Sequence, residues 1–421
     1  MQATPEIRDT TMRHRVGEVT LTVRGRDGQP LADSAVTVRQ HRHDFAFGNI
    51  AFDLLRLLGA PRHEDAAAGE SLSLDRYADL WLNLFNTATL PFYWGRYEPR
   101  RGEPDTQGRT EVARWLAERG VTLKGHPLVW HTVQPDWLLG LDLDEVEGLQ
   151  RRRIRDIVGG FAGLIDTWDA INEVVIMPVF ENGDNAITPL ARERGRIHMV
   201  RMAFEEARAA NPSAVLVLND FDLSSAYECL IEGVLEAGVK IDAIGLQTHM
   251  HQGFHGEEYL SGMLDRFARY GLPLHLTETS LVSGHLMPAH IEDLNDYQIP
   301  EWPSTPEGEA RQADEIVRHY RLLVGHPAVQ SINYWGVTDA GAWLGAPIGL
   351  LRADGSVKPS YTALEGLIKG EWWLPPTQLR TDASGRVNVC GFFGDYRVSA
   401  GDAQVAFAVR PGESTTSVSV G

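Results

Sequence analysis

Cysteine is scarce in this chain, whose 421 residues include only Cys229 and Cys390. Two cysteines cannot form a disulfide framework, and nothing in the sequence pairs them, so we expect an ordinary hydrophobic core to hold the fold. No stretch approaches the roughly 18 apolar residues of a membrane helix. Residues 1–16 also lack the apolar segment of a signal peptide. We therefore expect a cytoplasmic protein, or a secreted one whose leader has been removed.

Basic residues are also under-represented, with 39 lysines and arginines against 57 aspartates and glutamates and a formal net charge of −18. Such a chain repels phosphate backbones and anionic lipids, which excludes nucleic acid and membrane surfaces as partners. A glycine-rich phosphate loop is absent as well, because the glycines of residues 341–349 lack a strand–turn–helix context. Neutral sugars meet no such repulsion, and aromatic side chains can cover their apolar faces.

The middle of the chain alternates eight strand-like runs with eight helix-like segments. The runs rich in β-branched and aromatic residues are 45–52, 85–94, 122–130, 166–173, 215–221, 243–251, 272–281 and 332–339. Apolar residues recur at helical spacing in 74–84, 110–119, 146–164, 189–210, 226–236, 258–270, 308–323 and 361–368. Eight β-then-α units predict an α/β fold, a parallel (β/α)8 TIM barrel. A doubly wound open sheet is the rival, but it would not place so many polar residues at strand ends.

The two ends of the chain differ from this middle region. Residues 17–40 and 371–421 alternate apolar and polar residues between turn signals, as short strands do. Neither piece is large enough to form a stable sheet alone. We therefore expect residues 1–43 and 371–421 to form one small β-sandwich beside a catalytic barrel of residues 44–370.

Two glutamates stand where a barrel enzyme presents its reactive groups. Retaining glycoside hydrolysis needs one carboxyl group to protonate the leaving oxygen and a second, about 5 Å away, to attack the anomeric carbon. Glu173 ends the fourth expected strand and Glu278 ends the seventh, on facing sides of the mouth. Either residue alone could be a surface carboxylate or an ion-pair partner. Together they predict a retaining β-glycoside hydrolase with Glu173 as acid/base and Glu278 as nucleophile.

Polar neighbours fit this chemistry. Asn172 precedes the expected acid and can donate a hydrogen bond to a sugar hydroxyl. Gln247 and His249 end the sixth expected strand, next to the seventh. A single histidine is more often a satisfied core residue, but the position of His249 at the mouth favours a hydrogen bond to Glu278 that holds this glutamate ionised.

Several motifs around these residues resemble glycoside hydrolase family 10, the family of endo-β-1,4-xylanases. The similarity covers about residues 45–367. GHPLVWH at 125–131 resembles the family's GH-x-LVWH strand, and WDAINE at 168–173 resembles its acid/base motif WDVVNE. QTH at 247–249, TE at 277–278 and WGVTD at 335–339 follow in the family's order, with Trp343 after them. The resemblance implies a sugar site lined by His126, Trp130, Asn172, Gln247, His249, Trp335 and Trp343.

One stretch departs from the family pattern. The family's FN-x-x-T-x-EN-x-MKW supplies a Glu, an Asn and a Lys to the glycone side, whereas residues 85–94 read FNTATLPFYW. Leu90, Pro91, Phe92 and Tyr93 stand in place of that polar set, and Val133 replaces a glutamine. We therefore expect weak activity on xylan. The alternative is a β-glycosidase acting on another oligosaccharide or on a saponin-type glycoside, as tomatinase-like members of the family do.

Two further function classes are alternatives to this hydrolase. His41 with His43, and His249 with His251 and His255, have spacings that metal-dependent hydrolases use. His41 and His43, however, precede the first barrel strand, so we expect no metal and no other cofactor. A non-catalytic carbohydrate-binding protein remains as a remote alternative, but it would need no pair of glutamates.

Overall fold

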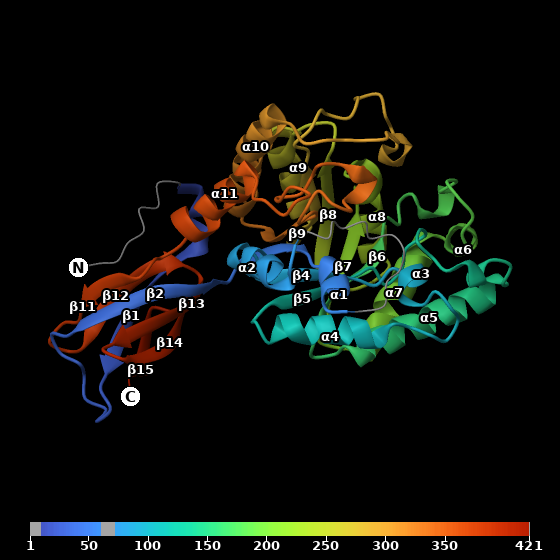
Figure 1. The fold of residues 1–421 in the computed structure, drawn as a ribbon. Helices are drawn as coiled ribbons and strands as arrows, with labels where there is room; N and C mark the ends of the chain where they lie inside the picture. Colours follow the sequence, from blue (N-terminus) through green and yellow to red (C-terminus); the bar gives the residue numbers. More distant parts are fainter. Residues whose placement is uncertain (1–9, 60–71, 421) are drawn as a thin grey trace.

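The computed structural model describes residues 10–59 and 72–420, whose central part is a closed parallel barrel (Figure 1). Around the barrel the strands follow the order β10-β3-β4-β5-β6-β7-β8-β9. Their bounds are β3 Ala46–Ile50, β4 Thr87–Pro91, β5 Thr122–His126, β6 Thr167–Asn172, β7 Val215–Asp220, β8 Ala243–Met250, β9 Leu274–Leu281 and β10 Val329–Tyr334. Closure of this sheet confirms the TIM barrel and excludes the open-sheet alternative.

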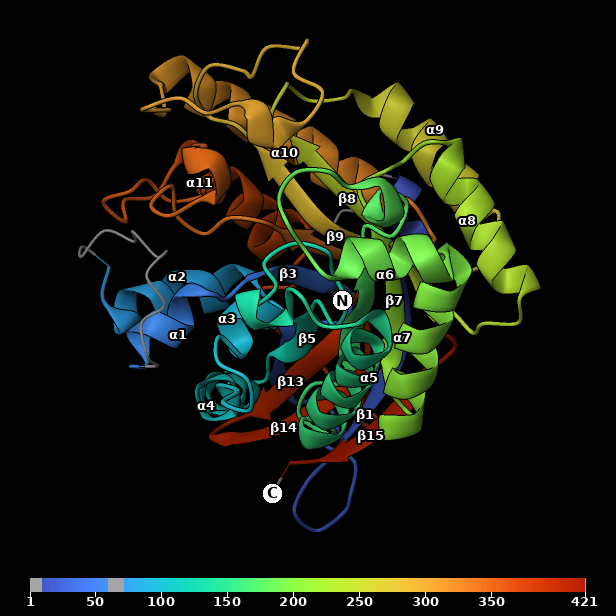
Figure 2. The same cartoon turned by 90° about the vertical axis from the view of Figure 1, so that its right-hand side faces the viewer.

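Helices surround the barrel on its outer side (Figure 2). The main ones are α2 Leu74–Leu84, α4 Thr106–Ala117, α5 Leu143–Gly160, α6 Ile187–Arg194, α7 Arg196–Ala210, α8 Ser225–Glu236, α9 Glu257–Ala268, α10 Pro306–Gly325 and α11 Pro359–Glu365. Short helices α1 Asp53–Leu57 and α3 Trp94–Tyr97 follow β3 and β4. The single helix expected at 189–210 is two helices, because Gly195 has a φ of 84°. Glycine adopts this left-handed conformation readily and ends α6 there.

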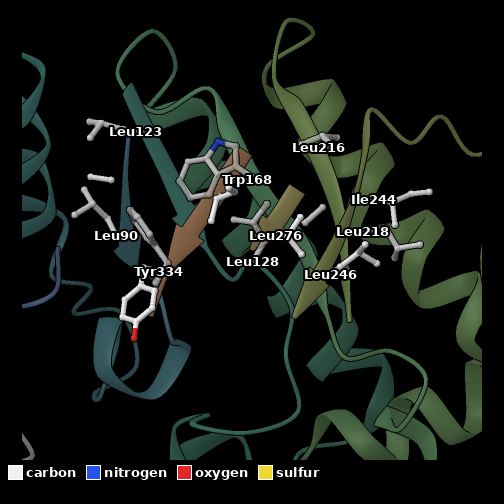
Figure 3. Close-up of a cluster of buried hydrophobic side chains, with 14 of the residues drawn as sticks. Leu90, Leu123, Leu128, Trp168, Leu216, Leu218, Ile244, Leu246, Leu276 and Tyr334 are labelled. Atoms are coloured by element: carbon white, nitrogen blue, oxygen red, sulfur yellow. The ribbon is translucent and has the colours of Figure 1, made fainter. Parts of the chain in front are cut away.

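Large apolar side chains from successive strands fill the core (Figure 3). Leucines of β4, β5, β7, β8 and β9 belong to one buried cluster with Trp168 of β6. A Cβ atom at residue 125 would collide with the Trp168 ring, so glycine is required at that position of β5. The core is therefore packed by interlocking shapes around Trp168.

Most expected strands extend too far at their carboxyl ends. The run 122–130 ends as a strand at His126, and the run 332–339 ends at Tyr334 after beginning at Val329. Beyond those points the chain turns outward, since the polar and aromatic side chains there belong to the loops above the barrel. The sequence periodicity does not separate a strand from the loop that continues it.

The expected β-sandwich is confirmed by two small sheets at one end of the molecule (Figure 1). One sheet has the order β12-β1-β15 and the other β11-β2-β13-β14. The strands are β1 Val16–Arg24, β2 Ala35–His43, β11 Thr377–Arg380, β12 Arg386–Phe392, β13 Gly394–Ala400, β14 Ala403–Val409 and β15 Thr415–Ser419. Their inward side chains share an apolar cluster separate from the barrel core. The assignment of residues 1–43, 44–370 and 371–421 to separate domains stays a prediction.

The sandwich is attached at the amino ends of the barrel strands. Arg15 Nε donates to the carbonyl of Val324 (3.0 Å), and Arg15 Nη2 donates to that of His326 (2.9 Å), just before β10. Arg42 Nη2 donates to Thr122 Oγ1, where β5 begins (2.6 Å). Buried His43 lies 2.9 Å from the carbonyl oxygen of Ile368 through Nε2. The sandwich therefore lies on the face opposite the carboxyl ends, where TIM barrels carry their active sites.

Cys229 and Cys390 are both free, as expected. Across residues 10–59 and 72–420, no helix combines the length and the apolar composition needed to cross a membrane.

Removing residues 377–421 should cause aggregation. β1 pairs only with β12 and β15 among the described strands, and β2 only with β11 and β13. The truncation would expose both edges of β1 and β2 together with their apolar faces. We expect high-molecular-weight material by size-exclusion chromatography with light scattering. A shorter truncation of residues 415–421 removes one partner of β1 and should be milder; a monomeric, heat-stable long truncation would contradict the pairing argument.

Candidate active site

Glu173 follows β6 directly and has an unusual backbone conformation. Its φ is 57°, and only Asp33, Val133 and Leu344 share a positive φ among the non-glycine residues of the described chain. The Glu173 amide donates to the carbonyl of Asn219 on β7 (2.8 Å). Such strained residues persist where surrounding contacts fix them, and they cluster at functional sites.

Three side chains donate hydrogen bonds to the Glu173 carboxyl group. Trp130 Nε1 lies 2.7 Å from Oε2. Asn172 Nδ2 and Gln247 Nε2 lie 2.9 Å and 3.2 Å from Oε1. The donors come from the loop after β5, from β6 and from β8, so three parts of the barrel rim hold this carboxyl group.

Glu278 lies within β9 and is 5% exposed. Asn219 Nδ2 donates to Glu278 Oε1 (3.0 Å), and His249 Nε2 lies 3.2 Å from Oε2. The other ring nitrogen of His249 lies 3.0 Å from Ser280 Oγ. His126 Nδ1 is 3.9 Å from Glu278 Oε1. His249 therefore lies between a hydroxyl group and this carboxylate, as expected for a group that stabilises its charge.

Amide side chains connect the two carboxyl groups. Asn219 Nδ2 donates to Asn172 Oδ1 (2.7 Å) as well as to Glu278. Gln247 Nε2 donates to the same Asn172 oxygen (3.1 Å) and to Glu173. Asn219 was not among the predicted site residues, although it is a polar residue at the end of an apolar strand. The network therefore connects the buried Glu278 to the partly buried Glu173 within one site.

The two carboxyl groups prefer opposite protonation states. Burial, reinforced by the negative charge of Glu278, raises the pKa of Glu173 to about 8. Burial also disfavours the charged form of Glu278. The charge of His126 and the hydrogen bond from His249 outweigh that effect, and the pKa of Glu278 lies below its ordinary value. Near neutral pH the site therefore holds one protonated and one ionised carboxyl group.

A buried ion cluster supports the floor of this site. Asp169 Oδ2 accepts from Lys124 Nζ (2.8 Å) and lies 2.7 Å from His126 Nδ1. Burial opposes the charge of Asp169, but the charge of Lys124 and the hydrogen bond of His126 lower its pKa. His126 is thereby fixed in orientation beside Glu278. The sequence predicted His126 but not Asp169 or Lys124, which lie beneath it.

Aromatic rings occupy the other half of the mouth. Trp335 lies 5.7 Å from Phe52, Phe52 lies 6.1 Å from Tyr93, and Tyr93 lies 5.5 Å from Trp130, measured between ring centroids. We call these four residues the aromatic wall. Trp343 stands beside the wall, with its ring centroid 5.1 Å from that of His249. The structure thus brings together all nine predicted site residues.

The residues that stand in place of the family's polar set do not all line the mouth of the barrel. Leu90 and Phe92 do not face the mouth: both are 0% exposed in the barrel core, where Phe92 packs against Phe161 and Trp168. Along a strand, alternate side chains point to opposite sides. The Tyr93 ring, by contrast, contacts the side chains of two predicted site residues, His126 and Trp130.

The histidines with metal-ligand spacing lie in separate places, except that the rings of His249 and His251 are neighbours (5.9 Å between centroids). His41 and His43 belong to β2 in the sandwich. His251 is fully buried between Trp302 and Trp343, and its ring nitrogens have no hydrogen-bond partner. Over the residues that the structure describes, no three His, Cys, Asp or Glu side chains converge as a metal site.

Comparisons with known proteins find one matching family profile and several similar proteins. A sequence profile described as glycosyl hydrolase family 10 matches residues 67–365, more than half of the chain. Endo-1,4-beta-xylanase B of Thermotoga neapolitana is 25% identical over 331 residues, which cover 73% of this chain and 88% of that protein. The endo-1,4-beta-xylanase/feruloyl esterase of Xylanibacter ruminicola is 28% identical over 293 residues, which cover 62% of this chain and only 39% of that protein.

Solved structures share the barrel. Xylanase 10B from Thermotoga petrophila RKU-1, crystallised in complex with xylobiose, superimposes with a TM-score of 0.61. It is 22% identical and covers 77% of this chain and 94% of its own. At this identity the likeness supports the fold.

Replacing Glu278 by glutamine should lower the pKa of Glu173. The substitution keeps the shape of the side chain but removes the negative neighbour. We expect the pKa to fall from about 8 and to remain raised, because burial is its larger cause. NMR titration of the labelled carboxyl carbon measures the change, with Glu181→Gln in the same loop as the control. An unchanged pKa of Glu173 in Glu278→Gln would show that the two groups are not coupled.

Proposed function

The chain belongs to glycosyl hydrolase family 10, and from this membership and the geometry of the site we propose that it hydrolyses β-glycosides with retention of configuration. The observation that carries the proposal is the pair of carboxyl groups, Glu278 buried and Glu173 partly buried, with opposite protonation preferences in one hydrogen-bonded network. A retaining glycosidase needs an acid and a nucleophile with these properties.

In the proposed first step, a Glu278 oxygen bonds to the anomeric carbon while the bond to the leaving oxygen breaks. Glu173 transfers its proton to that oxygen. In the second step, water gives a proton to Glu173 and attacks the anomeric carbon, which releases Glu278 as a carboxylate. The loss of negative charge on Glu278 lowers the pKa of Glu173, and this change suits its switch from acid to base.

The remaining predicted residues have supporting roles in this proposal. His249 and His126 stabilise the ionised Glu278, whereas Trp130 and Gln247 orient Glu173. The amide of Asn172 can donate to a sugar hydroxyl. Trp335 and Trp343 are proposed to close over the sugar ring, whose apolar face suits an aromatic surface.

A second candidate substrate class is favoured by the exposed side chains of the barrel loops. Val133, Val179, Phe221 and Leu286 are between 36% and 55% exposed, and they lie in loops after β5, β6, β7 and β9. An apolar leaving group could cover such side chains at a gain of about 25 cal/mol per Å². This observation favours a saponin-type glycoside over the xylan implied by the xylanase-like relatives.

Substitution of the two glutamates tests the mechanism. We expect Glu278→Ala to lose essentially all turnover. Glu173→Ala should lower kcat/KM by about 10²–10⁴ on alkyl glycosides and far less on dinitrophenyl glycosides, whose leaving group needs no proton. Glu181→Ala, in the same loop as Glu173, is the control and should retain activity. Equal losses for both variants on every leaving group would refute the assigned roles, and an inverted product by NMR would refute retention.

A substrate panel tests the two candidate classes. We expect kcat/KM on xylan at least tenfold below that on the best β-glycoside of an apolar aglycone, a difference of about 1.4 kcal/mol in transition-state stabilisation. The panel comprises xylan, xylohexaose, aryl and alkyl β-glycosides and saponins. A wide preference for xylan or xylohexaose would contradict the second class. Binding without hydrolysis of any member would instead favour the non-catalytic carbohydrate-binding alternative.

A further inference from the structure

The aromatic wall is continuous over four neighbouring strands of the barrel. Trp335 follows β10, Phe52 follows β3, Tyr93 follows β4 and Trp130 lies in the loop after β5. Each ring contacts the next, and the Phe52 ring stands nearly perpendicular to those of Trp335 (84°) and Tyr93 (89°). Half of the rim is thus formed by contacting rings, and the edge-to-face geometry of the two Phe52 contacts is a favourable arrangement for aromatic pairs.

The backbone holds this wall in place. The amide of Phe92, next to Tyr93, donates to the carbonyl of His126 (2.6 Å). The buried guanidinium group of Arg153 donates to the carbonyl groups of both Phe92 and Leu128. The segments that carry Tyr93 and Trp130 are therefore clamped together from behind, so the wall is part of the rigid barrel.

The position of the wall relative to the carboxyl pair determines which end of a bound sugar chain the wall can obstruct. In the closed eight-stranded order, β10 lies opposite β6. The leaving group departs toward Glu173, which follows β6. The non-reducing end of the bound sugar then points away from Glu173, toward Trp335 and Phe52.

Among the described residues, the rings of the wall itself offer a second sugar on that side few hydrogen-bonding groups. Phe52 has no hydrogen-bonding side chain, and Tyr93 offers one hydroxyl group. The nearby amide of Asn49 already bonds to the backbone of Gly336 in both directions. Sugar hydroxyls that are buried without partners cost about 1–3 kcal/mol each. The wall therefore obstructs an extended glycone both sterically and by lack of hydrogen bonds.

We propose that the aromatic wall limits the site to one sugar on the non-reducing side. The enzyme accordingly removes single terminal β-linked sugars and does not cut within a chain. This inference rests on the proposed hydrolase function and adds the position of cleavage to it.

The test compares glycones of one and two sugars on the same leaving group. The probes are 4-nitrophenyl β-xyloside and β-xylobioside, and 4-nitrophenyl β-glucoside and β-cellobioside. Release of nitrophenol from the wild-type protein should have a kcat/KM at least tenfold higher for the monosaccharide of the preferred pair. Xylohexaose or cellohexaose should release the monosaccharide first.

Substitutions test whether the wall causes this preference. Phe52→Ala should open the wall and shift the disaccharide-to-monosaccharide ratio of kcat/KM at least tenfold toward the disaccharide. Tyr93→Phe keeps the ring and should keep the ratio. Phe221→Ala removes an aromatic ring from the other half of the rim and should also leave the ratio unchanged. Circular dichroism and thermal melting establish that each variant is folded.

The outcomes distinguish a failure of the one-sugar proposal from a failure of the proposed hydrolase function. Faster cleavage of a disaccharide glycoside by the wild-type protein overturns the one-sugar proposal while the hydrolase function stands. An unchanged ratio in folded Phe52→Ala also overturns the role of the wall. Absence of turnover on all four nitrophenyl glycosides contradicts the proposed function itself, and the one-sugar proposal with it.

Discussion

Two carboxyl groups share one buried mouth, and only one of them can be charged at low free-energy cost. Removing a carboxylate from water is unfavourable unless charges and hydrogen bonds compensate. Glu278 receives that compensation from His249, from His126 and from the amide of Asn219. Glu173 is held mainly by neutral donors and so retains its proton to higher pH. The proposed roles of the other site residues follow from this difference in pKa between two chemically identical side chains.

The barrel divides its mouth into two halves that serve different purposes. Strands β6 to β9, together with His126 at the end of β5, provide the carboxyl, amide and imidazole groups, whereas β10, β3, β4 and the loop after β5 provide the aromatic wall. The polar half needs rigidity because its hydrogen bonds share atoms: one Asn172 oxygen accepts from both Asn219 and Gln247. The clamp of Arg153 gives the aromatic half a similar rigidity. The proposed chemistry belongs to the first half and the proposed selectivity to the second.

Sequence patterns predicted the barrel, the sandwich and the gathering of the nine site residues, because each depends on local periodicity or on a motif. They did not predict Asn219, whose importance comes from spanning β6 and β9 in space. They also misplaced Leu90 and Phe92 at the mouth, since a list of replaced residues does not record which side of a strand each one faces. Asp169 and Lys124 were not predicted for a related reason. Their ion pair forms between neighbouring strands, and the two residues are 45 positions apart in the chain.

The pairing of the sandwich strands has a consequence for the order in which the chain acquires its structure. β1 and β2 are synthesised before the barrel strands, yet the described strands that pair with them begin only at Thr377. Translation at about 5–20 residues per second separates these events by on the order of 20–60 s. The last barrel strand, β10, is synthesised within that interval. The barrel can therefore close before β1 and β2 have strands to pair with, and the sandwich forms only after β11 to β15 have been synthesised.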